Sequence, residues 1–514
     1  MLLRFFRIGK GDFGHEECFY IETERELTAD ETKLFQWLIT EPLGVVSRHG
    51  FLDDSDNKII EIGPRLSVET PFSSGAVLIC RAIGLPVRRV EKSVRVWRSP
   101  LGEETVRMDM DPMTEMVYEK PIQSFDSGQK PEPVRIVPLL AQGEDALRKE
   151  NTALGLGMDE WDIVYYTSLF KKLGRDPTTV ELFQLGNANS EHSRHWYFRG
   201  IQILDGKEMP ESLMDLVKKP LALARRNSIT AFHDNAGVIR GTGVPSFSPV
   251  KPGTPSVFGV ENVLQHITAT AETHNHPTLI APRPGAETGA GGRIRDNRAV
   301  GRGGLVHAGL AGYCVGNLHI PKFPIPGETS SSGTLSRVTA SPLEILIEGS
   351  NGISDYGNKI GEPLIGGFCR SFGLNIQGAL REFRKPVLYT AGLGRVRDEH
   401  VQKKSPEAGV MCIVRIGGPA YRIGVGGGSA SSMIHGNQSE TLDFKSVQRG
   451  DAEMENRANR VIQACAELGE KNPIESIHDQ GAGGPSNVIT ELVAPEGGIV
   501  REKYQRRRCH NVRA

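Results

Sequence analysis

The length of the chain sets the first limit on its fold, because 514 residues are too many to pack around one hydrophobic core. We expect a multidomain protein of about three or four folded units. Hydrophobic residues make up 38% of the sequence and charged residues 24%, which is ordinary for a globular protein with buried cores. The 59 glycines exceed the usual share without any collagen-like period, so they indicate loops rather than fibres.

Net charge and cysteine usage exclude several classes of protein. With a formal net charge of −1, the chain has no general attraction to nucleic acid or to anionic membranes, so any phosphate recognition must be local. Seven cysteines that are never spaced as CxxC argue against a disulfide framework and against a structural zinc site. No apolar run reaches the length of a membrane span, and residues 1–7 are too interrupted for a signal peptide, so we expect a cytoplasmic protein.

Composition and periodicity separate an N-terminal module from a helical segment. Residues 1–125 mix short apolar runs with turn residues, which is typical of a small α+β module. The polar, proline-bearing stretch Ser127–Pro133 marks its end. Apolar side chains at helical spacing then predict helices over 144–154 and 159–173, so residues 126–186 are expected to form a mostly helical linker.

The remainder of the chain reads as two α/β units and an irregular tail. Residues 187–350 alternate between strand-like and glycine-rich segments, and a second unit is expected over 351–500. Within it, residues 408–417 are interpreted as a buried strand, and residues 421–430 as a strand that runs into a glycine turn. Residues 501–514 are basic and lack periodicity, so they are interpreted as a frayed end.

Two neighbouring stretches, Ala271–Thr278 and Gly285–Asp296, place acidic, imidazole and anion-binding groups side by side. Glu272 and Asp296 are hard oxygen ligands of the kind that Mg²⁺ takes together with nucleotide phosphate oxygens. Glycines lack a Cβ, so successive amide N–H groups can turn toward an anion, and the arginines in the stretch add forked donors. The two stretches therefore predict a metal–nucleotide site.

The same residues have other interpretations. The glycine run is also compatible with a surface loop that happens to lie near an acid, and Arg293 and Arg295 with solvated surface charges. His274 and His276 form an H-x-H pair that is compatible with zinc, although no cysteine thiolate stands nearby in the sequence.

Eight motifs occur in one order along nearly the whole chain: Glu61–Leu66, Ser190–Trp196, Glu272–Pro277, Gly289–Asp296, Asp355–Pro363, Gly424–Ser432, Val447–Asp451 and His478–Gly484. Together they resemble the phosphoribosylformylglycinamidine synthase family in its long, single-chain form. The resemblance is specific because several long motifs agree. It implies that residues 1–125 are similar to the separate small subunit of the multi-subunit form, 187–350 to an ATP-binding domain of the aminoimidazole-ribonucleotide-synthetase kind, and 351–500 to its α/β partner domain.

The resemblance implies a step of de novo purine biosynthesis leading to IMP. ATP, glutamine and formylglycinamide ribonucleotide (FGAR) give formylglycinamidine ribonucleotide (FGAM), ADP, phosphate and glutamate. ATP activates an amide oxygen, and ammonia derived from glutamine then displaces the phosphate of the resulting iminophosphate. Phosphoryl transfer to a weakly nucleophilic amide oxygen needs Mg²⁺, positive charge and a base, which suits the residue types present.

The resemblance also implies roles for single residues. The catalytic residues are expected to be His274, as the base, and His192. Mg²⁺ would be held by Glu272, Asp296 and Asp479. ATP would contact Gly285, Ala286, Glu287, Thr288, Gly289, Ala290, Gly291, Gly292, Arg293, Ile294, Arg295, Asp296, Gly366, Gly367 and Phe368. The substrate would contact Thr273, Asn275, His276, Arg295 and Gln448.

Three of these residues have a structural alternative. His192 is also typical of a residue that hydrogen-bonds within a helix–loop junction. Gln448 and Asp479 are also typical of turn residues that close a strand.

The chain also departs from the long family form, which continues with a second synthetase-like repeat and a glutaminase domain carrying a nucleophilic cysteine. Cys509 stands in a basic tail rather than in a strand-to-helix nucleophile elbow, so glutamine hydrolysis is not expected of it. We expect a truncated product, an alternative transcript or a faulty gene model, with another chain supplying the second half and the ammonia.

Three functions follow from these expectations. The first is the ATP-dependent ligase or its synthetase half, the second a catalytically silent ATP-binding partner chain, and the third a zinc hydrolase that uses His274 and His276. In this superfamily two ATP-binding domains pair their sheets into a barrel. A single domain would expose apolar strands, so the chain alone is expected to self-associate.

Overall fold

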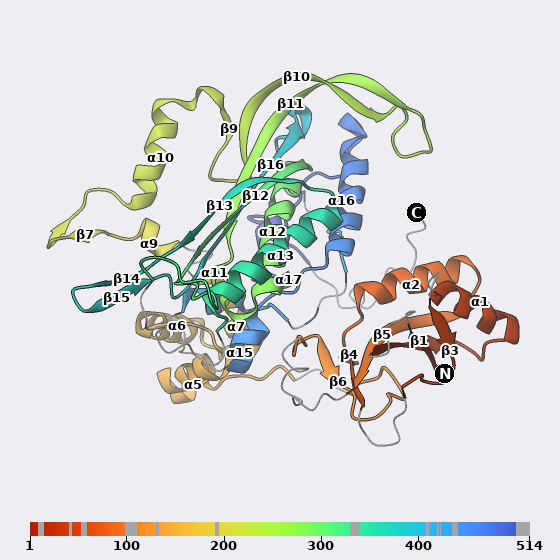
Figure 1. Cartoon of the computed structure of the whole chain (residues 1–514). Coiled ribbons are helices and arrows are strands. Elements are labelled where there is room, and N and C mark those ends of the chain that lie inside the picture. Colours follow the sequence, from red (N-terminus) through yellow and green to blue (C-terminus); the bar gives the residue numbers. More distant parts are fainter. Residues whose placement is uncertain are drawn as a thin grey trace. The chain divides into compact units, whose positions relative to one another are not determined.

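The computed structural model describes all residues except 9–14, 41–43, 53–58, 98–109, 129–132, 191–194, 329–338, 408–410, 419–420, 422, 434–439 and 500–514. The chain forms two compact units (Figure 1). Unit 1 comprises residues 1–133 and 418–421, and unit 2 comprises 134–417 and 422–514. Among the described residues, no helix combines the length and the apolar character that a bilayer span requires.

Unit 1 is built on a six-stranded antiparallel sheet in the order β3-β1-β2-β5-β4-β6. The strands are β1 (Leu2–Ile8), β2 (His15–Thr23), β3 (Val45–Ser47), β4 (Ile59–Pro64), β5 (Val87–Trp97) and β6 (Glu115–Val117). Helices α1 (Ala29–Ile39) and α2 (Pro71–Ala82) begin at the capping residues Thr28 and Thr70. A core that includes Phe5 joins the sheet to both helices. The α+β class expected for this module is confirmed.

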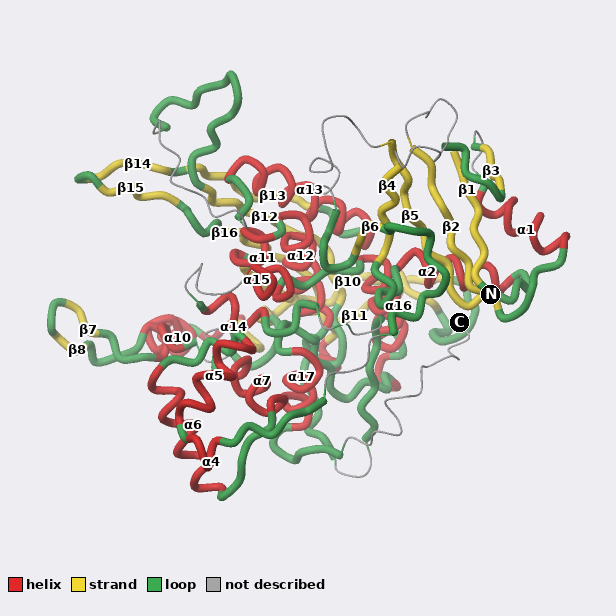
Figure 2. The backbone as a smooth tube through the Cα atoms, turned by 90° about the horizontal axis from the view of Figure 1, so that it is seen from below, coloured by secondary structure: helices red, strands yellow, loops and turns green. Residues whose placement is uncertain are grey.

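Unit 2 begins with a helical segment of α4 (Leu139–Gln142), α5 (Glu144–Leu154), α6 (Glu160–Leu173) and α7 (Thr179–Ala188). These helices lie together around one apolar core (Figure 2). Asp159 starts α6 with a capping box, and Gly174 ends it in the left-handed conformation at φ 66°. Both helices expected here, over 144–154 and 159–173, are confirmed.

The centre of unit 2 is a six-stranded mixed sheet in the order β13-β12-β16-β11-β10-β9. Its strands are β9 (Ser228–Thr230), β10 (Gly237–Pro249), β11 (Phe258–Thr273), β12 (Leu305–Val315), β13 (Leu364–Ser371) and β16 (Val387–Arg397). Helices α12 (Pro282–Arg298) and α13 (Pro342–Ile360) pack beside each other against this sheet (Figure 1). Ala286, Ala290 and Ile353 are fully buried between the helices and the sheet.

The other elements of unit 2 are short, or they flank this layer. They are α9 (Trp196–Arg199), β7 (Ile203–Leu204), β8 (Lys207–Glu208), α10 (Leu213–Leu223), η1 (Arg225–Asn227), α11 (Asn275–Ile280), β14 (Gly373–Ile376), β15 (Ala379–Glu382), η2 (Asp398–His400), α14 (Gly427–Ser432), α15 (Glu440–Ser446), α16 (Ala452–Ala466), η3 (Gly469–Lys471) and α17 (Gly484–Val493).

The two strands expected in the second α/β unit are wrong. Residues 411–416 form no strand, and the apolar side chains of Ile413 and Val414 are 48% and 74% exposed. Within 421–430, the described residues form turns followed by the start of α14, again without a strand. An apolar run can form a strand only where a neighbouring strand accepts its backbone hydrogen bonds, and none of the described strands pairs with these residues.

The hairpin of β10 and β11 carries an exposed apolar patch made by Phe247, Phe258 and Val260. Phe247 lies opposite Val260 across the two strands, and the rings of Phe247 and Phe258 are 5.2 Å apart. Their exposed fractions are 71%, 56% and 72%. Contiguous exposed apolar surface of this kind indicates an interaction site.

We expect the isolated chain to self-associate through this patch, as a concentration-dependent shift in sedimentation velocity. The double substitution Phe247→Lys/Val260→Lys should lower the fraction of associated protein, whereas Glu261→Gln on the same strand should not. A sharp monomeric boundary at every concentration, with cooperative melting, would contradict this expectation.

A buried histidine makes the stability of unit 2 depend on pH. His400 is fully buried, and its Nε2 lies 2.9 Å from the carbonyl oxygen of Gly469. Burial lowers the pKa of His400, so the folded state takes up a proton less readily than the unfolded state. Stability contributed by neutral His400 is therefore present above the unfolded pKa of about 6.5 and is lost as the pH falls below it.

We expect His400→Gln to reduce the fall in melting temperature between pH 7.5 and pH 5.5. Gln keeps a hydrogen-bond donor for Gly469 but cannot titrate. Thermal melts of both proteins at the two pH values check this, and equal falls would show that His400 is not responsible.

Candidate active site

The catalytic candidate His274 stands where β11 ends and α11 begins. Its backbone N–H donates to the carbonyl oxygen of Leu388 at 2.9 Å, which ties this corner to strand β16. Its ring Nε2 lies 3.2 Å from Oε2 of Glu272. Within the described part of the chain, the buried Nδ1 has no hydrogen-bond partner. With the proton of a neutral ring on Nε2, facing the carboxylate, Nδ1 carries a free lone pair and can act as a base.

The charge of Glu272 favours this arrangement. Burial alone would raise the pKa of Glu272, but the hydrogen bond and charge of His274 and the charge of Arg295 outweigh burial and lower it. Glu272 is therefore ionised at neutral pH and accepts the Nε2 proton of His274. When the imidazole is neutral, the hydrogen bond from Nε2 to this carboxylate selects the tautomer that leaves Nδ1 unprotonated.

Two further carboxylates approach Glu272. Asp296 on α12 and Asp479 both accept from the side-chain amide of Asn235, at 3.3 Å and 2.7 Å. Burial, followed by the charges of Glu272 and Asp479, raises the pKa of Asp296. Burial also raises the pKa of Asp479. The positive charge of Arg295 lowers this pKa, and the negative charge of Glu272 raises it further. Like charges held together in this way are neutralised by a proton or by a cation.

The donor chemistry at this point fits Mg²⁺, because all three side chains offer hard oxygen atoms. Among the residues that the structure describes, however, no three His, Cys, Asp or Glu side chains are grouped closely enough to form a ready-made metal centre.

The glycine-rich stretch Gly285–Asp296 is helical, so the alternative interpretation of it as a surface loop is wrong. These residues lie within α12, and most of them are buried. Their glycines permit close packing of the helix. A Cβ on Gly292 would stand 2.5 Å from Oε2 of Glu272, and one on Gly289 would stand 3.2 Å from Cβ of His274. The glycines thus let the helix approach Glu272 and His274 closely.

The two arginines of this stretch have different surroundings. Arg293 is completely buried and forms a two-pronged ion pair with Glu362, so its guanidinium is not available to a nucleotide in this structure. Arg295 is partly exposed, lies 3.1 Å from Glu455 and 3.9 Å from Asp479, and so stands beside the carboxylates. Of these two arginines, Arg295 is the one whose side chain reaches solvent.

The residues expected to contact substrate are divided between the surface and the interior. Thr273 is exposed at the end of β11, and the side-chain oxygen of Asn275 accepts the backbone N–H of Leu388 at 2.9 Å. His276 is buried, with Nε2 3.4 Å from Oγ of Ser446, so it does not face open solvent. The carbonyl oxygen of Gln448 accepts from Thr288 at 3.1 Å, which brings Gln448 to α12.

The remaining expected site residues lie on strand β13 or outside the described residues. Gly366, Gly367 and Phe368 are exposed on β13, the edge strand of the sheet, and the Phe368 ring is 5.9 Å from that of Tyr389. His192 lies outside the described residues, as do Cys509 and the tail that contains it.

Sequence reasoning missed the residues that connect the carboxylates, Asn235 and Lys403. Nζ of Lys403 donates to Oδ1 of Asn235 at 3.1 Å and pairs with Asp234 at 2.6 Å. They border an open cavity of about 520 Å³ whose lining also includes His233, Lys404 and His478. Neither residue belongs to a motif that marks chemistry by itself. Only the turn-forming Asp234-Asn235 pair between two strands offered a signal.

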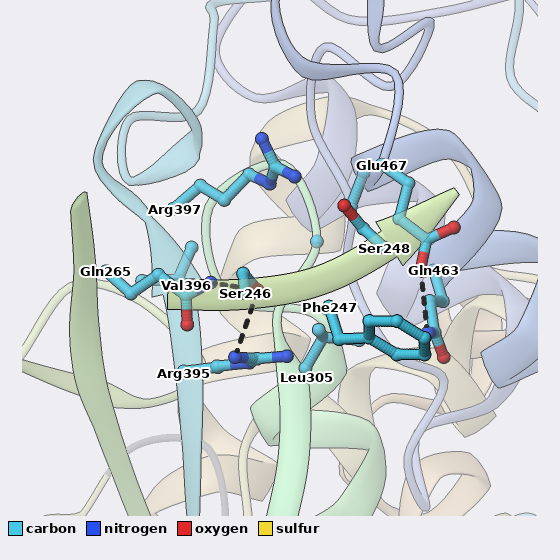
Figure 3. A pocket seen from close by; sticks show the side chains of 12 residues that line it. Ser246, Phe247, Ser248, Gln265, Leu305, Arg395, Val396, Arg397, Gln463 and Glu467 are labelled. Atoms are coloured by element: carbon cyan, nitrogen blue, oxygen red, sulfur yellow. Dashed lines mark hydrogen bonds between the residues drawn. The ribbon is translucent and has the colours of Figure 1, made fainter. Parts of the chain in front are cut away.

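A second, much smaller cavity lies elsewhere in unit 2. Figure 3 shows its lining, with Ser246 between Gln265 and Arg395, and the hydrogen bonds from these side chains to Ser246 are 3.2 Å and 3.5 Å long. Its volume is about 40 Å³, and its lining contains no expected site residue. It is not part of the candidate site.

Three family models match the chain in order. Residues 16–125 match the formylglycinamide ribonucleotide amidotransferase N-terminal model, residues 147–195 its linker domain, and residues 411–511 the AIR synthase related protein C-terminal domain. Among solved structures, Thermotoga maritima PurL complexed with FGAR is 27% identical, with a TM-score of 0.40 over 63% of this chain and 40% of that chain.

Two curated relatives extend over almost the whole chain. The probable phosphoribosylformylglycinamidine synthase, chloroplastic/mitochondrial, of Arabidopsis thaliana is 48% identical over 505 residues, which is 94% of this chain and 36% of the relative. Phosphoribosylformylglycinamidine synthase of Homo sapiens is 45% identical over 504 residues, or 94% and 37%. The chain thus spans little more than a third of the length of these relatives. With three matching domain models in order and this identity, the chain belongs to the phosphoribosylformylglycinamidine synthase family and corresponds to the N-terminal portion of its members.

Proposed function

We propose that the chain carries a synthetase site that converts FGAR to FGAM with ATP and ammonia, in purine biosynthesis. The observation that supports this most is the free Nδ1 of His274, since Glu272 holds the opposite ring nitrogen. A base for the amide proton is the group that such a reaction requires and that a passive nucleotide-binding chain does not. The names of the relatives give the class of product, a phosphoribosylformylglycinamidine.

The proposed chemistry has two steps. The amide oxygen of FGAR attacks the γ-phosphorus of ATP, the bond from that phosphorus to ADP breaks, and the amide proton passes to Nδ1 of His274. Ammonia then attacks the iminophosphate carbon, and the carbon–oxygen bond breaks to release phosphate. Arg295 supplies fixed positive charge near the transferred group, where negative charge is spread over the phosphoryl oxygens. His192 is kept as a second catalytic candidate.

We further propose that Glu272, Asp296 and Asp479 hold Mg²⁺ together with phosphate oxygens of ATP. Bound Mg²⁺ would offset the charge of the nucleotide and of this carboxylate group. The hydrogen bonds from one side-chain amide to both Asp296 and Asp479 support this, because they hold two hard oxygen donors at one place. Thr273, Asn275 and Gln448 are proposed to position FGAR, and β13 with Phe368 to contact the nucleotide.

The second candidate function is that of a catalytically silent chain that binds ATP as the partner of another chain. Such a partner would bind ATP without turning it over.

The test is an assay of phosphate release by the purified chain with FGAR, ATP and Mg²⁺, comparing ammonium chloride with glutamine. Release that needs both FGAR and ammonium supports the proposed ligase. Comparison with glutamine shows whether ammonia must come from another source. Absence of release in protein that is folded by circular dichroism and binds ATP favours the second candidate.

A further inference from the structure

The side-chain amide of Asn235 lies between two carboxylates and one ammonium group. Its Nδ2 donates to Oδ1 of Asp479 at 2.7 Å and to Oδ1 of Asp296 at 3.3 Å. Its Oδ1 accepts from Nζ of Lys403 at 3.1 Å. The amide therefore uses both of its ends, and it joins residues that are 61 and 244 positions away in the chain.

The surrounding charges fix the orientation of this amide. In the opposite orientation, Oδ1 would face two carboxylates and the NH₂ group would face the Lys403 ammonium, so every contact would be repulsive. Lys403 is itself fixed, because it pairs with Asp234 at 2.6 Å and Asp234 accepts the backbone N–H of Gly301 at 3.0 Å. The amide donors are thus directed at Asp296 and Asp479 before any ligand arrives.

The hydrogen-bond network around Asn235 extends to the central sheet. Oγ1 of Thr270 on β11 lies 3.4 Å from Oδ2 of Asp296, the oxygen that Asn235 does not contact. Among the hydrogen bonds of the described residues, none joins the Asp479 side chain to the sheet. Oδ2 of Asp479, the oxygen that Asn235 does not contact, lies 3.9 Å from Nε of Arg295. Of the hydrogen-bonding side chains that the structure describes, Asn235 thus supplies the one that contacts both carboxylates.

We propose that Asn235, oriented by Lys403, is a positioning residue that keeps Asp296 and Asp479 close together, so that a divalent cation can draw them into one binding site. This rests on the proposed function, in which these carboxylates carry Mg²⁺. Without the amide, the two carboxylates repel each other and separate, and a cation would have to bring them together again at a cost in affinity. Removing a residue that hydrogen-bonds to the metal ligands and orients them typically lowers metal affinity by about 10- to 100-fold.

The test uses Mn²⁺ as a spectroscopic substitute for Mg²⁺, with binding to the full chain followed by electron paramagnetic resonance. Asn235→Ala and Lys403→Met should each weaken Mn²⁺ binding by about 10- to 100-fold. Asn472→Ala is the matched control. Asn472 is also a buried asparagine, and its Nδ2 donates to the carbonyl oxygen of Arg302 at 2.9 Å, but it contacts neither carboxylate. Its loss should lower thermal stability without changing Mn²⁺ affinity.

The outcomes separate this inference from the proposed function. Lys403 touches neither carboxylate, so weakened Mn²⁺ binding by folded Lys403→Met supports the positioning role even where Asn235→Ala is unstable. Wild-type affinity in folded Lys403→Met or Asn235→Ala overturns the inference and leaves the ligase proposal standing. Absence of Mn²⁺ binding by the wild type overturns both the inference and the metal assignment. The ligase proposal itself is decided by ammonia-dependent phosphate release.

Discussion

Replacing His274 with alanine is expected to lower ammonia-dependent phosphate release by about 100- to 10,000-fold, the usual contribution of a positioned base. The reason is the free Nδ1, which has no partner among the described residues while Nε2 faces Glu272. ATP binding should change little, because the imidazole acts on the amide proton and not on the nucleotide. Initial rates of phosphate release and equilibrium ATP binding measure the two effects separately.

A control for this substitution is His319→Ala. The His319 side chain is 39% exposed and contacts Glu328, away from the carboxylate group. The control should keep wild-type activity. Glu272→Gln should also impair turnover, because a neutral amide no longer selects the tautomer with a free Nδ1. If His274→Ala retained more than about a tenth of the wild-type rate, His274 would not be the base, given the usual size of such contributions.

Replacing Arg293 with methionine is expected to destabilise unit 2 by about 3–5 kcal/mol, because Glu362 would be left as an unpaired buried charge. Arg293 is completely buried, the Glu362 side chain is 1% exposed, and the two meet through both oxygens of the carboxylate. Gly309 and Gly392 leave room for the guanidinium, since a Cβ on either glycine would lie 2.7 Å from one of its nitrogens. Urea denaturation followed by circular dichroism measures the loss.

Two further variants separate the buried charge from other effects. The double substitution Arg293→Met/Glu362→Leu should recover much of the lost stability, because the unpaired charge is removed with its partner. Arg457→Ala breaks the ion pair with Glu453, whose side chains are 37% and 49% exposed, and should cost no more than about 1 kcal/mol. Equal losses for the single and double substitutions would show that shape, not charge, dominates at Arg293.

The helical segment at the start of unit 2 could be predicted from the sequence, because its helix ends carry local signals. Asp159 and Gly174 mark both ends of α6, and Thr178 caps α7. The apolar residues between them follow a helical period. Each of these signals depends only on neighbouring residues, so the segment is correctly predicted without knowledge of the rest of the chain.

The glycine-rich stretch shows where such signals are insufficient. A loop that cradles phosphate and a helix that packs tightly against a strand both require residues without a Cβ. The position of Gly292 against Glu272 follows from the path of β11 and α12 together, not from their sequences taken singly. The same applies to residues 411–416, which have the composition of a strand but no partner among the described strands.

The candidate site was predictable only in part for a related reason. Glu272, His274, Arg295 and Asp296 stand in motifs and lie together as expected. Arg293 stands two positions before Arg295 and has the same chemistry in the sequence, but its side chain turns into the core. This follows because residues two positions apart in a helix point to nearly opposite sides. Asn235 and Lys403 stand 168 positions apart, and only the folded chain brings them together.

The central claim is that ATP activates the amide oxygen of FGAR, and oxygen-isotope transfer tests it most directly. FGAR labelled with ¹⁸O in that amide would be incubated with the chain, ATP, Mg²⁺ and ammonium, and the released phosphate would be analysed by mass spectrometry. The account predicts one ¹⁸O atom in each phosphate released. When ammonia displaces phosphate, the carbon–oxygen bond breaks and the former amide oxygen leaves with the phosphate. Unlabelled phosphate would mean that water receives the phosphoryl group, and would contradict the proposed synthetase chemistry.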